Sequence, residues 1–178
     1  MLYVVDLVSG VTYLDNIMYV VCWKSSTISL YNMDTYSPLD VVINVSGMED
    51  PSDMVVSRDD HQLFIADDLE CIWRVSVGDQ SYVKWLTQST GHGFGTLSLT
   101  SRRLLVTSLD SRHIHQYDVT DRQLLRVVNL PEHMKQVSHA VETTRGTFVV
   151  GHEGTLLNQW QDAVSELFSV CHRWTKWL

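Results

Sequence analysis

The sequence contains few cysteines, prolines and basic residues, and it has no long apolar run. Its 178 residues include three cysteines, three prolines and 13 lysines and arginines against 21 acidic residues. Three widely spaced cysteines are too few for a disulfide framework. We expect Cys22 and Cys71 to act as small buried hydrophobic residues, in a reduced, cytoplasmic setting. No apolar run approaches the roughly 20 residues of a membrane span, and no signal peptide is visible, so we expect no membrane partner.

The charge balance argues against nucleic acid as the main partner. Phosphate backbones are bound by clustered lysines and arginines. Here the formal net charge is −8, and the basic residues are scattered, with Arg102-Arg103 as the single adjacent pair. A basic patch assembled by folding would be the exception, because a charge sum contains no geometry.

An apolar pattern recurs about every 42 residues, with four strand-like segments in each unit. The markers of the four segments are, in order, Val55, Leu97 and Ala140; Val21, Ile65, Val106 and Val149; Ile28, Ile72, Ile114 and Leu156; and Val41, Val83 and Leu125. This pattern predicts an all-β protein, a β-propeller with four-stranded antiparallel blades, of which about three and a half are present.

The expected strands follow from the β-branched and aromatic residues between turn signals. They are 11–14, 17–23, 27–33, 39–45, 54–56, 63–66, 71–77, 82–86, 96–99, 104–108, 113–119, 124–130, 137–142 and 147–150, and residues 2–8 match the outermost strand of a preceding blade. We expect residues 1–160 to form the partial propeller and residues 161–178 to form a tail. Within the tail, residues 162–172 suit a short helix slightly better than a strand.

Residues 63–75, Leu63-Phe-Ile-Ala-Asp-Asp-Leu-Glu-Cys-Ile-Trp-Arg-Val75, resemble the core of an NHL repeat. Residues 106–118 repeat the motif, and residues 20–31 are a weaker copy without the aspartate. The resemblance implies a propeller related to the six-bladed lactonase-type propellers. Closed NHL-like propellers have five or six blades, so this chain is either part of a longer product or completes a ring with another copy. We also expect open blade edges, which allow self-association.

Three groups of residues are candidates for chemistry, and each has a plainer interpretation. His113 and His115 share one face of a strand and could bind a metal, but no third ligand is placed. The run Gly91–Gly95 lacks the lysine of a phosphate loop and reads as an inter-strand loop. Carboxylates at hairpin turns suit either turns or a divalent cation, as the lactonase-type propellers hold in their central channel; they are Asp67, Asp68, Glu70 and Asp110.

None of these groups is assigned as catalytic, cofactor-binding or metal-binding. The sequence therefore favours a non-catalytic protein-interaction platform that binds a protein partner through loops at one face of the propeller. Two alternatives stay open. One is a metal (calcium)-dependent hydrolase of the lactonase type, and the other is a single-stranded RNA-binding NHL domain.

Overall fold

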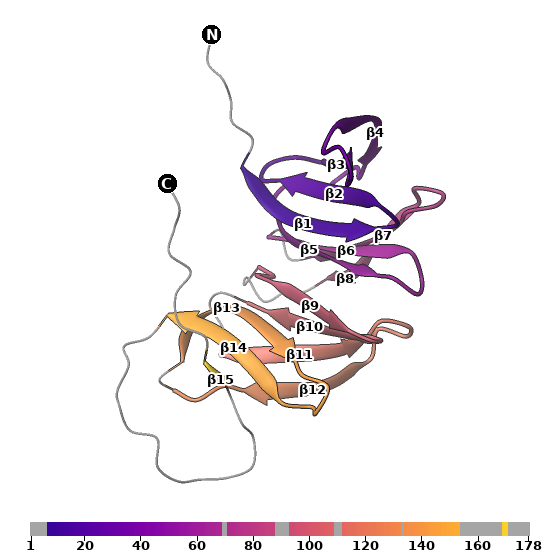
Figure 1. The fold of residues 1–178 in the computed structure, drawn as a ribbon. Helices are drawn as coiled ribbons and strands as arrows, with labels where there is room; N and C mark the ends of the chain where they lie inside the picture. Colours follow the sequence, from indigo (N-terminus) through magenta and orange to yellow (C-terminus); the bar gives the residue numbers. More distant parts are fainter. Residues whose placement is uncertain are drawn as a thin grey trace.

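The computed structural model describes residues 7–68, 71–87, 93–108, 112–132, 134–153 and 169–170. These residues form fifteen β-strands in four sheets, which follow one another along the chain and stack face to face (Figure 1). We call the sheets blades 1 to 4 in chain order. In this part of the chain, no helix is long and apolar enough to cross a membrane.

Blades 1 to 3 each have four antiparallel strands, in the order in which they occur along the chain. Blade 1 contains β1 (Val8–Leu14), β2 (Ile17–Cys22), β3 (Thr27–Asn32) and β4 (Pro38–Asn44). Blade 2 contains β5 (Pro51–Ser57), β6 (Gln62–Asp67), β7 (Cys71–Ser76) and β8 (Tyr82–Thr87). Blade 3 contains β9 (Leu97–Thr100), β10 (Arg103–Thr107), β11 (His113–Asp118) and β12 (Leu124–Asn129). These strands confirm the predicted all-β fold of four-stranded units.

Blade 4 contains an antiparallel pair, β13 (Lys135–Glu142) and β14 (Phe148–Glu153), and a short strand, β15 (Ser169–Val170). β15 runs parallel to β14, so it does not have the direction of the third strand of a blade. The expected helix over 162–172 and the division at residue 160 lie otherwise outside the described residues. Three complete blades and part of a fourth agree with the predicted three and a half.

The first strand of each blade lies next to the first strand of the following blade. β1 contacts β5, β5 contacts β9, and β9 contacts β13. These strands are the inner ones, and β4, β8 and β12 form the outer edges. Val41, Val83 and Leu125, the markers of the fourth strand, are exposed on these outer edges.

Apolar side chains fill the space between successive blades in three clusters. Ile28, Ile72 and Ile114 are completely buried, and each points toward the blade that follows its own. We call this side of a blade its following face, and the opposite side its preceding face. Because each face is covered by a neighbouring blade, both faces of a strand are apolar, which explains why the segments alternate poorly.

The strand pairings correct three of the predicted marker residues. In the four blades, the equivalent pairs on the preceding face are Val11 with Val20, Met54 with Ile65, Leu97 with Val106, and Ala140 with Val150. Val20 and Val150 therefore take the places predicted for Val21 and Val149, and Met54 takes that of Val55. A shift of one residue moves a side chain to the other face. Because both faces are apolar, the sequence alone gave no sign of the shift.

The turns at one end of the blades use the left-handed backbone conformation in a regular way. Between the third and fourth strands of blades 1 to 3, Tyr36, Gln80 and Arg122 have φ values of 54°, 56° and 65°. Between the first and second strands, Ser101 and Gly146 have φ values of 53° and 78° in blades 3 and 4. Equivalent corners thus share a backbone geometry although their side chains differ.

Candidate functional site

A cleft of about 470 Å³ opens between blades 3 and 4, at the end where the left-handed corners lie. The residues that line it are polar or charged, except for one glycine: Thr100, Ser101, Arg102, Arg103, Asp118, Glu142, Thr143, Thr144 and Gly146. The β9–β10 and β13–β14 turns supply most of these residues, and the end of β11 supplies Asp118. The adjacent basic pair of the sequence therefore lies at this cleft.

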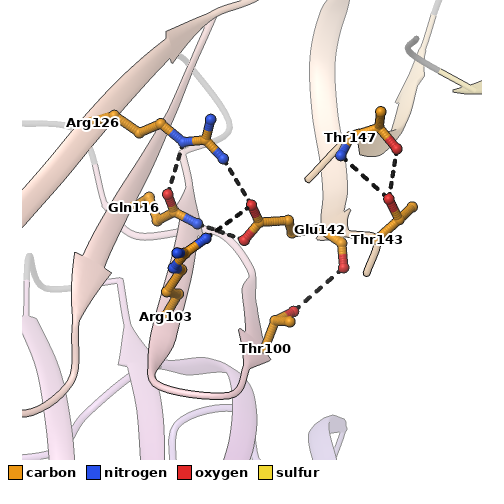
Figure 2. A network of polar contacts seen from close by, with 7 residues as sticks. All are labelled: Thr100, Arg103, Gln116, Arg126, Glu142, Thr143 and Thr147. Atoms are coloured by element: carbon orange, nitrogen blue, oxygen red, sulfur yellow. Dashed lines mark hydrogen bonds and ion pairs between the residues drawn. The ribbon is translucent and has the colours of Figure 1, made fainter. Parts of the chain in front are cut away.

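A buried carboxylate, that of Glu142, forms part of the cleft wall, and its side chain is only 3% exposed. Its Oε2 accepts a hydrogen bond from Nε2 of Gln116 at 2.7 Å, and its Oε1 accepts one from Nη2 of Arg126 at 2.8 Å (Figure 2). Nη1 of Arg103 lies 3.5 Å from the same Oε1. Two guanidinium groups therefore compensate one carboxylate, which removes most of the cost of burying it.

Arg126 is fixed in place by contacts on several sides. Its Nε donates to Oε1 of Gln116 at 2.8 Å, which closes a ring of hydrogen bonds with Glu142. Its guanidinium group also lies over the ring of Phe148, 4.7 Å from the ring centre. Such a contact adds a cation–π attraction. Arg126 is therefore a structural partner of Glu142.

Arg103 is the more available of the two arginines. Its side chain is 55% exposed, and it touches Glu142 only at the limit of hydrogen-bond distance. A guanidinium group has five N–H donors. The contact with Glu142 orients Arg103 and leaves donors that can bind a ligand in the cleft.

Threonine side chains stabilise the turn on the blade 4 side of the cleft. The hydroxyl oxygens of Thr143 and Thr147 are 2.6 Å apart, and the backbone N–H of Thr147 donates to the Thr143 hydroxyl at 3.3 Å. Across the junction, the hydroxyl of Thr100 donates to the backbone carbonyl of Glu142 at 3.4 Å (Figure 2). The two sides of the cleft are thus tied together next to the buried carboxylate.

Asp118 adds a negative charge at the edge of the cleft. Hydrogen bonds from the backbone N–H and hydroxyl of Thr120 hold the pKa of the exposed Asp118 carboxyl below its usual range, and the nearby charge of Arg102 contributes less. Asp118 is therefore ionised at neutral pH and partly balances Arg102. Arg103 is then the cation on which a bound anion would depend most.

The arrangement presents hydrogen-bond donors and hydroxyl groups at the cleft. Both oxygens of Glu142 accept hydrogen bonds from protein groups, so the carboxylate holds side chains in position. Guanidinium groups bind carboxylates through paired, charge-assisted hydrogen bonds. The neighbouring hydroxyls of Ser101 and Thr144 can add neutral hydrogen bonds.

The two candidate histidines share a strand but do not converge. His113 and His115 lie on β11 with ring centres 6.4 Å apart. Nδ1 of His113 is hydrogen-bonded to Oδ1 of Asn129 at 2.7 Å, and His115 stacks on Tyr117. Burial, followed by the charge of His113, lowers the pKa of His115. The pair therefore packs within blade 3 and against its neighbouring side chains.

Of the four turn carboxylates, Asp67 and Asp68 are described, and Glu70 and Asp110 lie outside the described residues. Asp67 is completely buried. Its carboxylate accepts hydrogen bonds from the backbone N–H groups of Glu49 and Asp50 and from Nε1 of Trp73, at 3.2, 3.1 and 2.9 Å. It thus ties the segment between blades 1 and 2 to blade 2, which is a structural role.

The remaining candidates lie at the same end of the blades as Asp67. Burial, and then the charges of Asp50 and Asp67, raise the pKa of Asp68. Gly93 lies so close to Asp68 that an added Cβ would be 2.7 Å from the Asp68 carbonyl oxygen, so this part of the predicted loop requires glycine. In the described parts of the chain, no group of three or more histidine, cysteine or acidic side chains is placed to bind a metal ion.

The described cysteines have different surroundings. Cys71 is buried, as predicted, whereas Cys22 is only half-buried; Cys171 lies outside the described residues. Burial, and then the charge of Asp67, raise the pKa of the Cys71 thiol to about 11. Because the thiolate is the reactive form, Cys71 is a packing residue.

Sequence reasoning missed the Glu142 network, although a signal was present. Glu142 occupies the position that Leu99 and Val56 hold in blades 3 and 2, and Gln116 occupies the position of Leu30 in blade 1. Glu142 could have been noticed as a charged residue at a repeat position that is otherwise uncharged, whereas the position of Gln116 is also polar in blade 2, where Arg74 holds it. Recognising that Glu142 and Gln116 face each other needed the correct register.

The stacked four-stranded sheets, joined through their inner strands, define this chain as a partial β-propeller. No family model matches the sequence, and no curated protein matches it. Solved structures that share the fold include two computationally designed proteins, Ika8 and Ika4, and the β-propeller domain of Cps50 (Swd1) from Myceliophteria thermophila. At 12%, 14% and 11% sequence identity, these likenesses concern the fold alone.

The extent of the match differs among the three structures. Ika8 has a TM-score of 0.61, and the match covers 80% of this chain and 42% of Ika8. The Swd1 domain has a TM-score of 0.62, with 82% and 49% covered. Ika4 has a TM-score of 0.66, with 85% of this chain and 89% of Ika4 covered. This chain thus spans less than half of two of these structures and most of the third.

Proposed function

We propose that this chain is a protein-interaction module that binds an acidic segment of a partner protein in the cleft between blades 3 and 4. The observation that carries the proposal is the position of Arg103. A buried carboxylate, Glu142, orients it, while its side chain stays 55% exposed at the cleft. The donors of its guanidinium group that do not face Glu142 can bind a carboxylate through paired hydrogen bonds.

The charge of the whole chain supports a selective site. With a net charge of −8, most of the surface repels an acidic segment. The cleft is an exception, because three guanidinium groups, those of Arg102, Arg103 and Arg126, face two carboxylates there, those of Asp118 and Glu142. A short acidic motif would therefore bind here and not elsewhere on the chain.

The proposal includes two finer statements that the sequence suggests. One is that the propeller is of the NHL type, which the motif at residues 63–75 supports. The other is that the protein acts in a reducing, cytoplasmic setting, in keeping with its few and separate cysteines.

The experiment is a selection from a random peptide library, followed by affinity measurements on the selected peptides. We expect enrichment of peptides with adjacent acidic residues. Arg103→Glu should weaken their binding about tenfold or more, since a charge-assisted hydrogen bond contributes about 1.5–3 kcal/mol. Arg102→Glu should weaken it less, because Asp118 already balances that charge.

Arg112→Glu is the matched control. It makes the same change of charge at an exposed arginine beside β11, at the other end of the blade. An equal loss of affinity with Arg112→Glu would mean that overall charge, and not the cleft, governs binding. Enrichment of peptides without acidic residues, or stronger binding of single-stranded RNA than of any peptide, would contradict the proposal.

A further inference from the structure

The charges at the cleft end of the blades are unevenly distributed. In the turns of blades 1 and 2 at this end, the charged residues are one arginine and five aspartates: Arg58, Asp15, Asp34, Asp59, Asp60 and Asp79. In the turns of blades 3 and 4 and the strand ends beside them, the balance is reversed. Four exposed arginines stand against two aspartates there: Arg102, Arg103, Arg122, Arg145, Asp118 and Asp121. One half of this surface therefore repels anions, and the other half attracts them.

Arg122 and Arg145 extend the basic surface beyond the lining of the cleft. The backbone N–H of Arg122 donates to the carbonyl oxygen of Asp118, a lining residue, at 3.0 Å. Arg145 lies between two lining residues, Thr144 and Gly146. Three turns thus bring arginines to one cleft from different parts of the sequence.

The carboxylates at this end already have partners within the chain. Each aspartate accepts a hydrogen bond from the backbone N–H two residues further on, at 2.7 Å for Asp118 and 2.9 Å for Asp121. The carboxylate of Glu142 is bonded to Arg126, so the charges of this buried pair cancel. The four exposed arginines and the two aspartates then leave an excess of two positive charges.

We propose that the acidic segment bound at this cleft is a phosphorylated segment, held through the phosphate of a serine or threonine side chain. Such a phosphate carries about −1.5 to −2 charges at neutral pH and has three acceptor oxygens. It therefore balances the excess charge, whereas a single carboxylate leaves about half of it uncompensated. This inference rests on the proposed function and names the chemical class of its ligand.

The donors at the cleft match the three oxygens of a phosphate. The planar fork of Arg103 can bind two of them through parallel, charge-assisted hydrogen bonds. The hydroxyl groups of Ser101 and Thr144, which line the same cleft, supply neutral donors for the third. A carboxylate has two oxygens and would use fewer of these donors.

The charge distribution also favours a single phosphate over a nucleic-acid strand. A strand carries a phosphate at every nucleotide and needs a basic surface that follows its backbone. In the described chain, the neighbouring turns of blade 2 carry Asp59, Asp60 and Asp79, which would repel such a backbone. The excess of positive charge is confined to one junction, and this suits one phosphorylated residue.

The experiment compares peptides that differ at one central residue. A peptide library with random flanking residues is made with phosphoserine, glutamate or serine at the fixed position, and the selected sequences are measured by fluorescence anisotropy. We expect each phosphopeptide to bind about tenfold more tightly than its glutamate counterpart. Glutamate counterparts that bind equally well would overturn this inference and leave the proposed function intact. If none of the three forms binds, the proposed function fails as well.

Variants at the rim test the charge argument, because Arg122 and Arg145 do not line the cleft. The double variant Arg122→Gln, Arg145→Gln removes the excess of two charges. We expect the preference for phosphoserine over glutamate to fall from about tenfold to about twofold. Arg103→Lys keeps the charge but loses the planar fork, so it should weaken phosphopeptide binding about fivefold.

Arg112→Gln is the matched control, because it removes the charge of an exposed arginine at the other end of blade 3. It should keep the full preference for phosphoserine, and circular dichroism of every variant should show the same β-sheet spectrum. A preference that survives in the double variant, or one that Arg112→Gln reduces equally, would overturn the inference. So would tighter binding of vesicles that contain phosphatidylinositol phosphates than of the phosphopeptides.

Discussion

The junction between blades 1 and 2 and the junction between blades 3 and 4 use equivalent positions in opposite ways. In the junction between blades 1 and 2, at the end of the blades where the left-handed turns lie, Leu30 and Val56 belong to one apolar cluster. At the equivalent positions of the other junction, Gln116 donates a hydrogen bond to Glu142. Blades can therefore pack without polar contacts at this end, so packing alone does not require the Glu142 network.

Each junction nevertheless contains one buried carboxylate, and the two carboxylates lie at opposite ends of the blades. Asp67 binds the backbone that leads from blade 1 to blade 2, and Glu142 binds side chains that border the cleft. Replacing a buried ionic network by apolar residues often costs nothing. The Glu142 network therefore stands at a position where apolar packing would suffice, next to an arginine that is 55% exposed.

The largest effect is expected from Asp67→Ala, which breaks the anchor of the first junction. Three donors, the N–H groups of Glu49 and Asp50 and Nε1 of Trp73, would lose their acceptor. We expect a loss of about 3 kcal/mol in the free energy of unfolding, measured by urea denaturation. Asp59→Ala, at an exposed turn aspartate, should change it by less than about 0.5 kcal/mol. A loss for Asp67→Ala as small as the loss for Asp59→Ala would show that the contacts of Asp67 contribute nothing to stability.

Glu142→Ala should have the next largest effect, about 2 kcal/mol, because Arg126 and Gln116 lose their common partner. The loss is smaller than for Asp67 because both arginines can reach water. Val56→Ala, at the equivalent position of the first junction, should cost about 1 kcal/mol. Glu132→Ala, at an exposed glutamate, should be neutral in the same urea titration. A neutral Glu142→Ala would remove the distinction between the two junctions.

Making the junction between blades 3 and 4 apolar, like the junction between blades 1 and 2, should have the smallest effect on the free energy of unfolding and the largest effect on peptide affinity. In the triple variant Gln116→Leu, Arg126→Leu, Glu142→Val, the unfolding free energy should stay within about 1 kcal/mol of the wild type. Binding of acidic peptides should nevertheless fall, because Arg103 loses the carboxylate that orients it. Unchanged peptide affinity in a folded triple variant would mean that the network has no part in recognition.

A smaller, pH-dependent effect is expected at the junction between blades 2 and 3. Burial, and then the charge of His113, lower the pKa of His115, so the folded chain binds a proton there less readily than the unfolded chain. The free energy of unfolding should therefore have its full value above the usual histidine pKa of about 6.5 and should decrease as the pH drops below it. His115→Phe should flatten this dependence in denaturation experiments across that range, whereas His139→Phe, at an exposed histidine, should preserve it.

The strands of this protein were predictable because their cause is local. Short apolar segments between turn residues recur at a fixed period, and the fourteen segments predicted within residues 11–150 overlap observed strands. The segment predicted at residues 2–8 lies almost entirely outside the described residues. The direction in which side chains point was not predictable from the same pattern. Val20 and Val21 are both apolar because a blade buries both faces, and only the pairing of Val20 with Val11 assigns its face.

The candidate site was less accessible to sequence reasoning, for a physical reason. Arg103, Gln116 and Glu142 are far apart along the chain, and blade stacking alone brings them together. Arg102 and Arg103 were visible in the sequence as a pair of charges. Their position at a cleft depends on how the β9–β10 turn, the β13–β14 turn and the end of β11 come together. The turn aspartates, by contrast, were candidate ligands of a divalent cation in the sequence, and in the structure Asp67 is a structural anchor.

The corners at the cleft end of the blades show how such a surface could diversify. Tyr36, Gln80 and Arg122 occupy equivalent positions with the same left-handed backbone conformation, although their side chains are chemically different. All three side chains are exposed, and none belongs to an apolar cluster between blades. Single substitutions at this rim would change the chemistry of the surface while the packed blades kept their shape, so the surface can vary here without a loss of folding.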